Sequence, residues 1–187
     1  RVLFLSFPVD LLKEDPVNFL MGLIKKYDYP FEADKNLHYR FPLSDMPVEF
    51  SSWFNKTFDP VYLKDWEIFY TPPGGGLVIH SDGYLPFLNY TKFNFVYDGD
   101  NSLMKWYELK EGEVLDEAIP NTYSRMYTAI RPEQVDFKYE SNIGVPSLVD
   151  VGSPHGIDNS ANTKGRWCIC FHPNFKKLEN RPTTRVM

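Results

Sequence analysis

Residues 66–109 have the sequence WEIFYTPPGGGLVIHSDGYLPFLNYTKFNFVYDGDNSLMKWYEL, in which short runs rich in Val, Ile, Phe, Tyr and Trp are separated by turn residues. This pattern is typical of consecutive β-strands. The turn signals are PPGGG at residues 72–76 and DGDN at residues 98–101, and the second predicts a hairpin. Strands are expected at residues 66–70, 77–80, 92–97, 102–109, 147–151 and 166–171.

Residues 1–60 have a different pattern, with a short apolar strand expected at 2–7 and helices after it. Asp15 is a good N-cap residue, and the proline after it suits the first position of a helix. Apolar residues then recur at helical spacing over 16–27, and again after a second start near 44–47. We expect both helices to cover a sheet.

The chain has 187 residues, of which 17% are aromatic, and no linker or internal repeat divides it. This length favours one domain. The predicted fold is mainly β (α+β), a jelly-roll barrel or sandwich with N-terminal flanking helices. Its expected parts are a flanking α lobe (1–60), a β-barrel core (61–175) and a C-terminal tail (176–187).

Charge, hydrophobicity and cysteine content argue against several classes of protein. The net charge is −5 and lysine and arginine form no cluster, so nucleic acid is not an expected partner. No apolar run approaches the roughly 20 residues that span a membrane, and the N-terminus lacks a signal-peptide pattern. Cys168 and Cys170 are too few for a Cys-rich zinc site, and a disulfide between them would be strained. We therefore expect a soluble, cytoplasmic protein with reduced thiols.

Three potential metal ligands stand out, namely His80, Asp82 and His155. The first two lie two residues apart at the end of a predicted strand, so their side chains face the same way. Two imidazoles and one carboxylate on one face of an octahedron leave three positions open, which suits non-haem Fe(II). A His-x-Asp pair alone is a weak signal, because a surface hydrogen-bonded pair has the same sequence.

Arg166 begins the last predicted strand. Alternation along this strand places Arg166 and both cysteines on one face and the apolar residues between them on the other. An arginine that faces a barrel interior needs an anion, and a carboxylate fits its guanidinium in a bidentate manner. A core acid such as Asp150 or Asp158 is the alternative partner to a bound ligand.

The sequence resembles the 2-oxoglutarate- and Fe(II)-dependent oxygenases in four residues: His80, Asp82, His155 and Arg166. The segment PHGIDNSANTKGRWCICF (154–171) is similar to the aspartyl/asparaginyl β-hydroxylase-like branch. The resemblance implies a double-stranded β-helix and a hydroxylase that uses O2 and 2-oxoglutarate on a small molecule or peptide. It implies that the first three residues hold Fe(II) and that Arg166 binds the far carboxylate of 2-oxoglutarate.

Further contacts to 2-oxoglutarate are expected from Lys92 and Asn94, which share a strand face, and from Trp106 or Tyr107. Core packing is the alternative role of the aromatic residues. Two other functions remain open. A zinc-dependent hydrolase could use the same ligands with a further general base, and a non-catalytic jelly-roll binding module would instead present an exposed aromatic patch.

Overall fold

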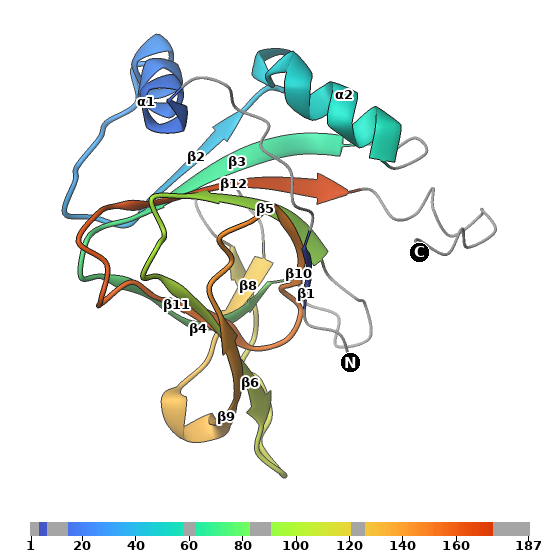
Figure 1. The fold of residues 1–187 in the computed structure, drawn as a ribbon. Coiled ribbons are helices and arrows are strands. Elements are labelled where there is room, and N and C mark those ends of the chain that lie inside the picture. The colour runs from blue at the N-terminus through green and yellow to red at the C-terminus, as the bar shows by residue number, and fades with distance from the viewer. Residues whose placement is uncertain (1–3, 7–14, 58–62, 83–90, 121–125, 174–187) are drawn as a thin grey trace.

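The structure is a computed structural model, and it describes residues 4–6, 15–57, 63–82, 91–120 and 126–173. Within these residues the strands form two antiparallel sheets that face one another, and two helices lie over the outer face of one sheet (Figure 1). The predicted mainly β, jelly-roll fold class is confirmed. The expected boundary near residue 60 and the expected tail at 176–187 lie outside the described residues.

The first sheet has the strand order β1-β10-β5-β12-β3-β2, and the second has the order β7-β8-β4-β11-β6-β9. The first comprises β1 (Phe4–Ser6), β10 (Ser147–Asp150), β5 (Thr91–Tyr97), β12 (Arg166–Pro173), β3 (Leu63–Thr71) and β2 (Leu37–Phe41). The second comprises β7 (Ile119–Pro120), β8 (Met126–Ala129), β4 (Gly76–Asp82), β11 (His155–Asp158), β6 (Leu103–Leu109) and β9 (Val135–Ser141).

The helical elements are α1 (Pro16–Lys26), α2 (Val48–Thr57) and two 3-10 turns, η1 (Leu43–Asp45) and η2 (Pro132–Gln134). Asp15 caps α1, because its carboxylate accepts the backbone N–H of Val17 at 3.0 Å. Both helices cover the first sheet, as expected, and bury Leu20 and Phe50 completely against it.

The two faces of the first sheet differ in composition. Ile169 and Phe171 of β12 are fully buried in the aromatic core beneath the helices. Arg166, Cys168 and Cys170 of the same strand point between the two sheets. The alternation predicted for β12 is therefore present, and the inner face carries the polar side chains.

The six strands predicted from residue 66 onward are all present, and the strand expected at 2–7 corresponds to β1, but β2, β7, β8, β9 and β11 were not predicted. The strand β2 lies within the segment expected to flank the barrel and instead joins the first sheet beside β3. The strand β9 lies at the edge of the second sheet, and most of its side chains are exposed. Short or solvent-facing strands lack the sustained apolar pattern by which a sequence reveals a strand.

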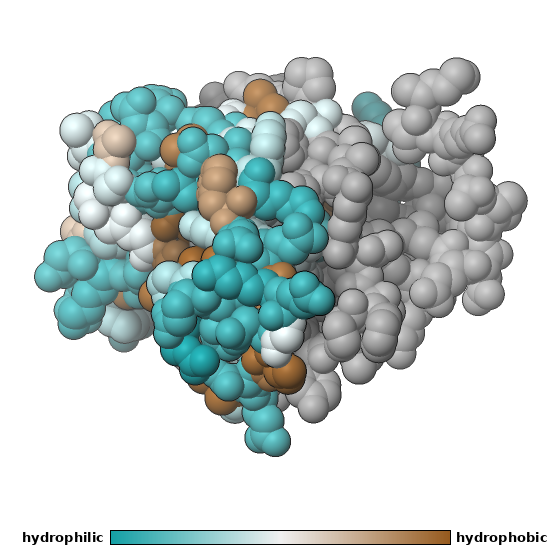
Figure 2. All heavy atoms as spheres, turned by 90° about the horizontal axis from the view of Figure 1, so that it is seen from below, coloured by the Kyte–Doolittle hydropathy of each residue, from teal (hydrophilic) through white to brown (hydrophobic). Residues whose placement is uncertain are grey.

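On the side of the molecule away from the helices, the surface formed by the described residues is largely hydrophilic, with scattered hydrophobic residues (Figure 2). Two of the exposed apolar side chains belong to β9, where Phe137 is 58% exposed and Tyr139 is 45% exposed. Among the described helices, none has the length and apolar character needed to cross a membrane.

Candidate metal centre

A cavity of about 610 Å³ lies between the two sheets. Its wall includes β5 and β12 of the first sheet and β4 and β11 of the second. The predicted ligands His80, Asp82 and His155 all line it. The cavity thus brings residues from opposite sheets to one space that is partly open to solvent.

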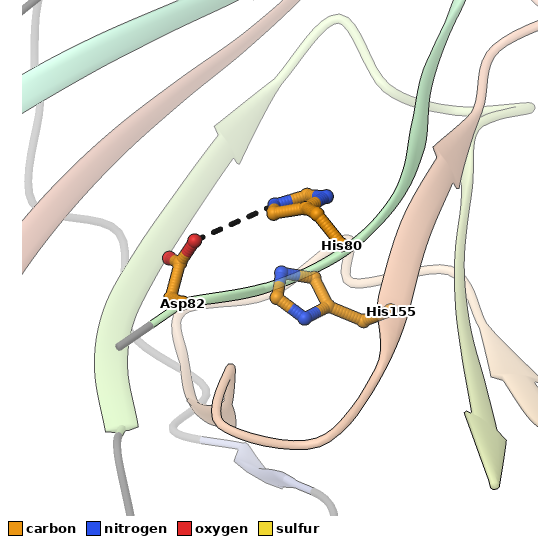
Figure 3. A group of neighbouring side chains, drawn as sticks. All are labelled: His80, Asp82 and His155. Carbon is orange, nitrogen blue, oxygen red and sulfur yellow. Dashed lines mark ion pairs between the residues drawn. The ribbon is translucent and has the colours of Figure 1, made fainter. Parts of the chain in front are cut away.

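The three predicted ligands converge. One ligand atom from each of His80, Asp82 and His155 lies within 4.8 Å of the other two. His80 Nε2 is 3.5 Å from Asp82 Oδ1, and the two imidazole centroids are 4.3 Å apart (Figure 3). His80 and Asp82 come from the end of β4, and His155 begins the neighbouring strand β11.

Each histidine ring is oriented by a backbone carbonyl two residues before it. His80 Nδ1 donates to Val78 O at 2.8 Å, and His155 Nδ1 donates to Ser153 O at 2.9 Å. In a neutral imidazole whose Nδ1 carries the proton, Nε2 has a free lone pair. Hydrogen bonds of this kind fix the tautomer and orientation of metal-binding histidines. The donor set therefore fits a divalent metal ion.

The turn before His155 is bonded to β4, which holds the ligand-bearing segments together. Ser81 Oγ donates to Gly152 O at 2.6 Å, and the backbone N–H of Asp82 donates to Val151 O at 2.8 Å. Gly156 follows the second histidine, and a Cβ there would lie 3.0 Å from the carbonyl oxygen of Leu77. The glycine therefore permits the close approach of β11 to β4.

Lys92 on β5 contacts the carboxylate of this group. Its Nζ lies 2.5 Å from Asp82 Oδ2, and both side chains are largely buried. Burial alone would raise the pKa of Asp82, but Lys92 and the two imidazoles outweigh it and hold that pKa well below its ordinary value. Burial alone would lower the pKa of Lys92, whereas the carboxylate raises it above the ordinary value. Both groups are therefore charged at neutral pH.

Burial, together with the adjacent His80 ring, lowers the pKa of His155 to about 3. The imidazole of His155 is therefore neutral at physiological pH. A neutral ring is the form that binds metal ions. Protons do not compete with a metal ion for this ligand in the physiological range.

Arg166 lies at the start of β12 and is only 4% exposed. It lines the cavity, and no carboxylate of the described residues forms an ion pair with its guanidinium. Asp158 instead binds Lys105 at 2.7 Å, and the carboxylate of Asp150 accepts the backbone N–H of Gly152 at 3.0 Å. Neither predicted alternative partner thus pairs with Arg166.

No protein-family model and no curated protein matches the sequence. Among solved structures, HygX from Streptomyces hygroscopicus with nickel and 2-oxoglutarate bound is similar over 92% of this chain and 83% of its own. The identity is 11% and the TM-score is 0.50. The chain therefore shares its jelly-roll fold with HygX. The resemblance in sequence is therefore matched by the fold, while the aspartyl/asparaginyl branch stays a prediction.

Two further solved structures are similar. Escherichia coli ycfD has 17% identity and a TM-score of 0.44, and the match covers 86% of this chain but only 44% of ycfD. The viral collagen prolyl hydroxylase of Paramecium Bursaria Chlorella virus-1 has 10% identity and a TM-score of 0.41, with 92% and 96% of the two chains covered.

The residues predicted to contact 2-oxoglutarate differ in their positions relative to the cavity. Lys92 and Asn94 line the cavity with Arg166, and Lys92 is bonded to Asp82. Trp106 does not line it. Its indole is fully buried and its Nε1 donates to Asp150 O at 2.9 Å, so the structure places Trp106 in the core, which was the alternative expected for it.

Four further residues of the cavity wall were not predicted as site residues: His38, Tyr127, Cys168 and Cys170. The cysteines could have been found, because they share the strand face of Arg166. His38 and Tyr127 lie on short strands that the sequence does not reveal. His38 stacks on Phe69 with ring centroids 4.2 Å apart.

Proposed function

We propose that this chain is a 2-oxoglutarate- and Fe(II)-dependent dioxygenase that hydroxylates a peptide side chain or a small molecule. The proposal rests on Arg166, a buried cation that faces the same cavity as the ligand triad and has no described carboxylate partner. One carboxylate of a five-carbon diacid would be the missing partner of Arg166, while the other end of the diacid reaches the metal ion. The shared fold with HygX, which was solved with 2-oxoglutarate bound, supports the same cosubstrate.

The three ligands would share the task of holding the metal ion, each through one atom. His80 and His155 would hold Fe(II) through Nε2, and Asp82 through Oδ1. Lys92 contacts Oδ2 and so directs a single carboxylate oxygen toward the ion. When bound, Fe(II) supplies the activation of O2 that couples decarboxylation of 2-oxoglutarate to hydroxylation.

Arg166 positions the cosubstrate. Its planar guanidinium matches a carboxylate in a bidentate manner, which fixes the direction of the diacid as well as its distance from the ion. Leu77, Met104 and Ile157 contribute apolar wall to the cavity, which limits the water around this ion pair and strengthens it. A contact from Asn94 to the same ligand stays a prediction.

The zinc-hydrolase alternative needs a second general base near the ion. Among the described residues that line the cavity, Asp82 is the single carboxylate, and Lys92 already contacts it. The one further imidazole in the described wall, that of His38, lies 3.4 Å from a carboxylate oxygen of Glu67. This composition favours an oxygenase. The binding-module alternative is favoured by one observation, the exposed rings of Phe137 and Tyr139 on β9. Ligand binding at these rings would survive removal of metal by a chelator, whereas binding of 2-oxoglutarate in the cavity would not.

The test is anaerobic addition of Fe(II) and then 2-oxoglutarate to the metal-free protein, followed by visible absorption. We expect the weak charge-transfer band of a chelated 2-oxoacid. His80→Ala should abolish the band, because one imidazole ligand is lost. Arg166→Ala should retain it, but only at a concentration of 2-oxoglutarate at least tenfold higher.

Arg131→Ala is the matched control, since Arg131 is 58% exposed and pairs with acids outside the cavity. It should leave the affinity for 2-oxoglutarate unchanged. Succinate release on admission of O2 then measures turnover. A folded wild-type protein that gives no band, or an Arg166→Ala variant with unchanged affinity for 2-oxoglutarate, would contradict the proposal.

A further inference from the structure

The only two cysteines of the chain form a thiol pair in the cavity wall. Cys168 and Cys170 form no disulfide, are 2% and 3% exposed, and both line the cavity. Their Sγ atoms are 3.5 Å apart, because residues i and i+2 of β12 project from the same face. The proposed oxygenase chemistry uses neither thiol, so the pair has no assigned role.

The separation of the sulfurs suits a metal ion better than a disulfide. Along one strand, positions i and i+2 lie roughly 6.6 Å apart, near the upper limit for the Cα atoms of a disulfide. By contrast, an ion about 2.3 Å from each of two sulfurs 3.5 Å apart subtends an angle of about 99° between them. That angle is close to tetrahedral, so both sulfurs can bind one ion with little movement of β12.

The charges around the pair are compatible with a bound dication. A hydrogen bond with Cys170, and then the charges of Arg166 and Lys92, lower the pKa of the Cys168 thiol, whereas burial raises that of Cys170. Exchange of two thiol protons for one divalent ion leaves the net charge of the wall unchanged. The two cations therefore do not oppose the exchange. Asn94 Oδ1 lies 3.1 Å from Cys170 Sγ and offers a third ligand atom.

We propose that Cys168 and Cys170 bind one soft divalent ion, of the class of Zn²⁺ or Cd²⁺, as a two-sulfur chelate at a second site in the cavity. Thiolate ligands select soft ions over Mn²⁺ or Mg²⁺, which prefer oxygen. The second site therefore differs in selectivity from the histidine and carboxylate site. The inference does not rest on the proposed oxygenase function, because it needs neither 2-oxoglutarate nor turnover.

The experiment is a titration of the reduced wild-type protein with Cd²⁺, monitored by the ultraviolet absorption of cadmium–thiolate bonds. We expect the absorption to saturate at one ion per chain and to be accompanied by proton release. His80→Ala removes a ligand of the other site and should retain the full absorption. Cys168→Ser and Cys170→Ser should each weaken the binding at least tenfold, because a chelate becomes a single bond.

Val96→Ala is the matched control, since Val96 pairs with Cys168 in the β12–β5 register and carries no ligand atom. It should leave the cadmium absorption unchanged. If a cysteine variant does not fold, a second measurement takes its place, namely the rate at which the wild-type thiols react with a thiol-reactive reagent in the presence and absence of metal ions. Cd²⁺ should slow that reaction at least tenfold, and Mn²⁺ should not. Absence of the absorption in wild type, equal affinity in a folded cysteine variant, or failure of protection would overturn the inference.

Discussion

The two faces of the first sheet carry different parts of the protein. The outer face of β12 presents Ile169 and Phe171 to the aromatic core beneath the helices. The inner face of the same strand presents Arg166 and both cysteines to the cavity. Because alternate residues of one strand face opposite ways, a strand of eight residues contributes to both stability and a binding site.

The energetic consequences of the two faces are opposite. Burial of aromatic side chains beneath the helices stabilises the fold. Burial of charged groups such as Lys92 and Asp82 costs free energy unless each is paired. Burial on the outer face therefore offsets the free energy that burial of charged groups on the inner face costs. Substitutions on the two faces should change the free energy of unfolding by different amounts.

The largest expected effect is on the outer face. Phe171 is fully buried and packs against Phe54 with ring centroids 5.0 Å apart. Phe171→Ala should lower the free energy of unfolding by about 3–5 kcal/mol, because it removes aromatic contacts and leaves a cavity. Denaturant unfolding measures the loss. Phe137→Ala is the matched control, since Phe137 is 58% exposed and should lose less than about 0.5 kcal/mol. Equal losses in the two variants would contradict this description of the outer face.

A smaller effect is expected from the inner face. Lys92→Met keeps the length of the side chain but leaves the buried carboxylate of Asp82 without its ammonium partner. The free energy of unfolding of the metal-free protein should fall by about 3 kcal/mol. The double variant Lys92→Met/Asp82→Asn should recover much of the loss, because no charge is then left unpaired. Denaturant unfolding at neutral pH measures both variants.

Lys105→Met is the control for the Lys92 variant, because Lys105 pairs with Asp158 where water reaches both side chains. It should cost less than about 1 kcal/mol. Addition of a divalent metal ion should stabilise both wild type and Lys92→Met. In the variant, the ion replaces the missing positive charge beside Asp82. A metal-free Lys92→Met variant as stable as wild type would show that the pair contributes nothing to folding.

The same difference between faces explains what the sequence could predict. Long strands with aromatic runs, such as β5 and β12, are evident because their outer residues must pack on a core. The convergence of His80, Asp82 and His155 and the inward position of Arg166 were predictable from residue type and alternation, whereas the roles of these residues stay predictions. The short strand β2 was missed, and with it the position of His38 in the wall. The ion pair of Lys92 with Asp82 joins strands of opposite sheets, and no local pattern reports such a contact.

The smallest expected effect is at the second sheet, where Asp158 begins the turn after β11. Hydrogen bonds from Lys105 and Ser160 hold the pKa of Asp158 below its ordinary value. In the unfolded chain this carboxyl titrates near about 3.9. The folded state therefore favours the ionised form. Its contribution to stability is fully present above the unfolded-state pKa and is lost as the pH falls through the lower pKa of the folded state.

Asp158→Asn keeps an oxygen that can accept the backbone N–H of Ser160, so it removes the charge with little change to the turn. At pH 7 the free energy of unfolding should fall by roughly 0.5 kcal/mol, a small value because water screens a side chain that is 34% exposed. Below about pH 4 the difference from wild type should shrink, because the carboxyl of the unfolded chain becomes protonated, and it should vanish once the pH falls below the lowered pKa of the folded protein. Paired denaturant curves at pH 7 and in acid measure it. A difference independent of pH would assign the effect of Asp158 to turn geometry rather than to its charge.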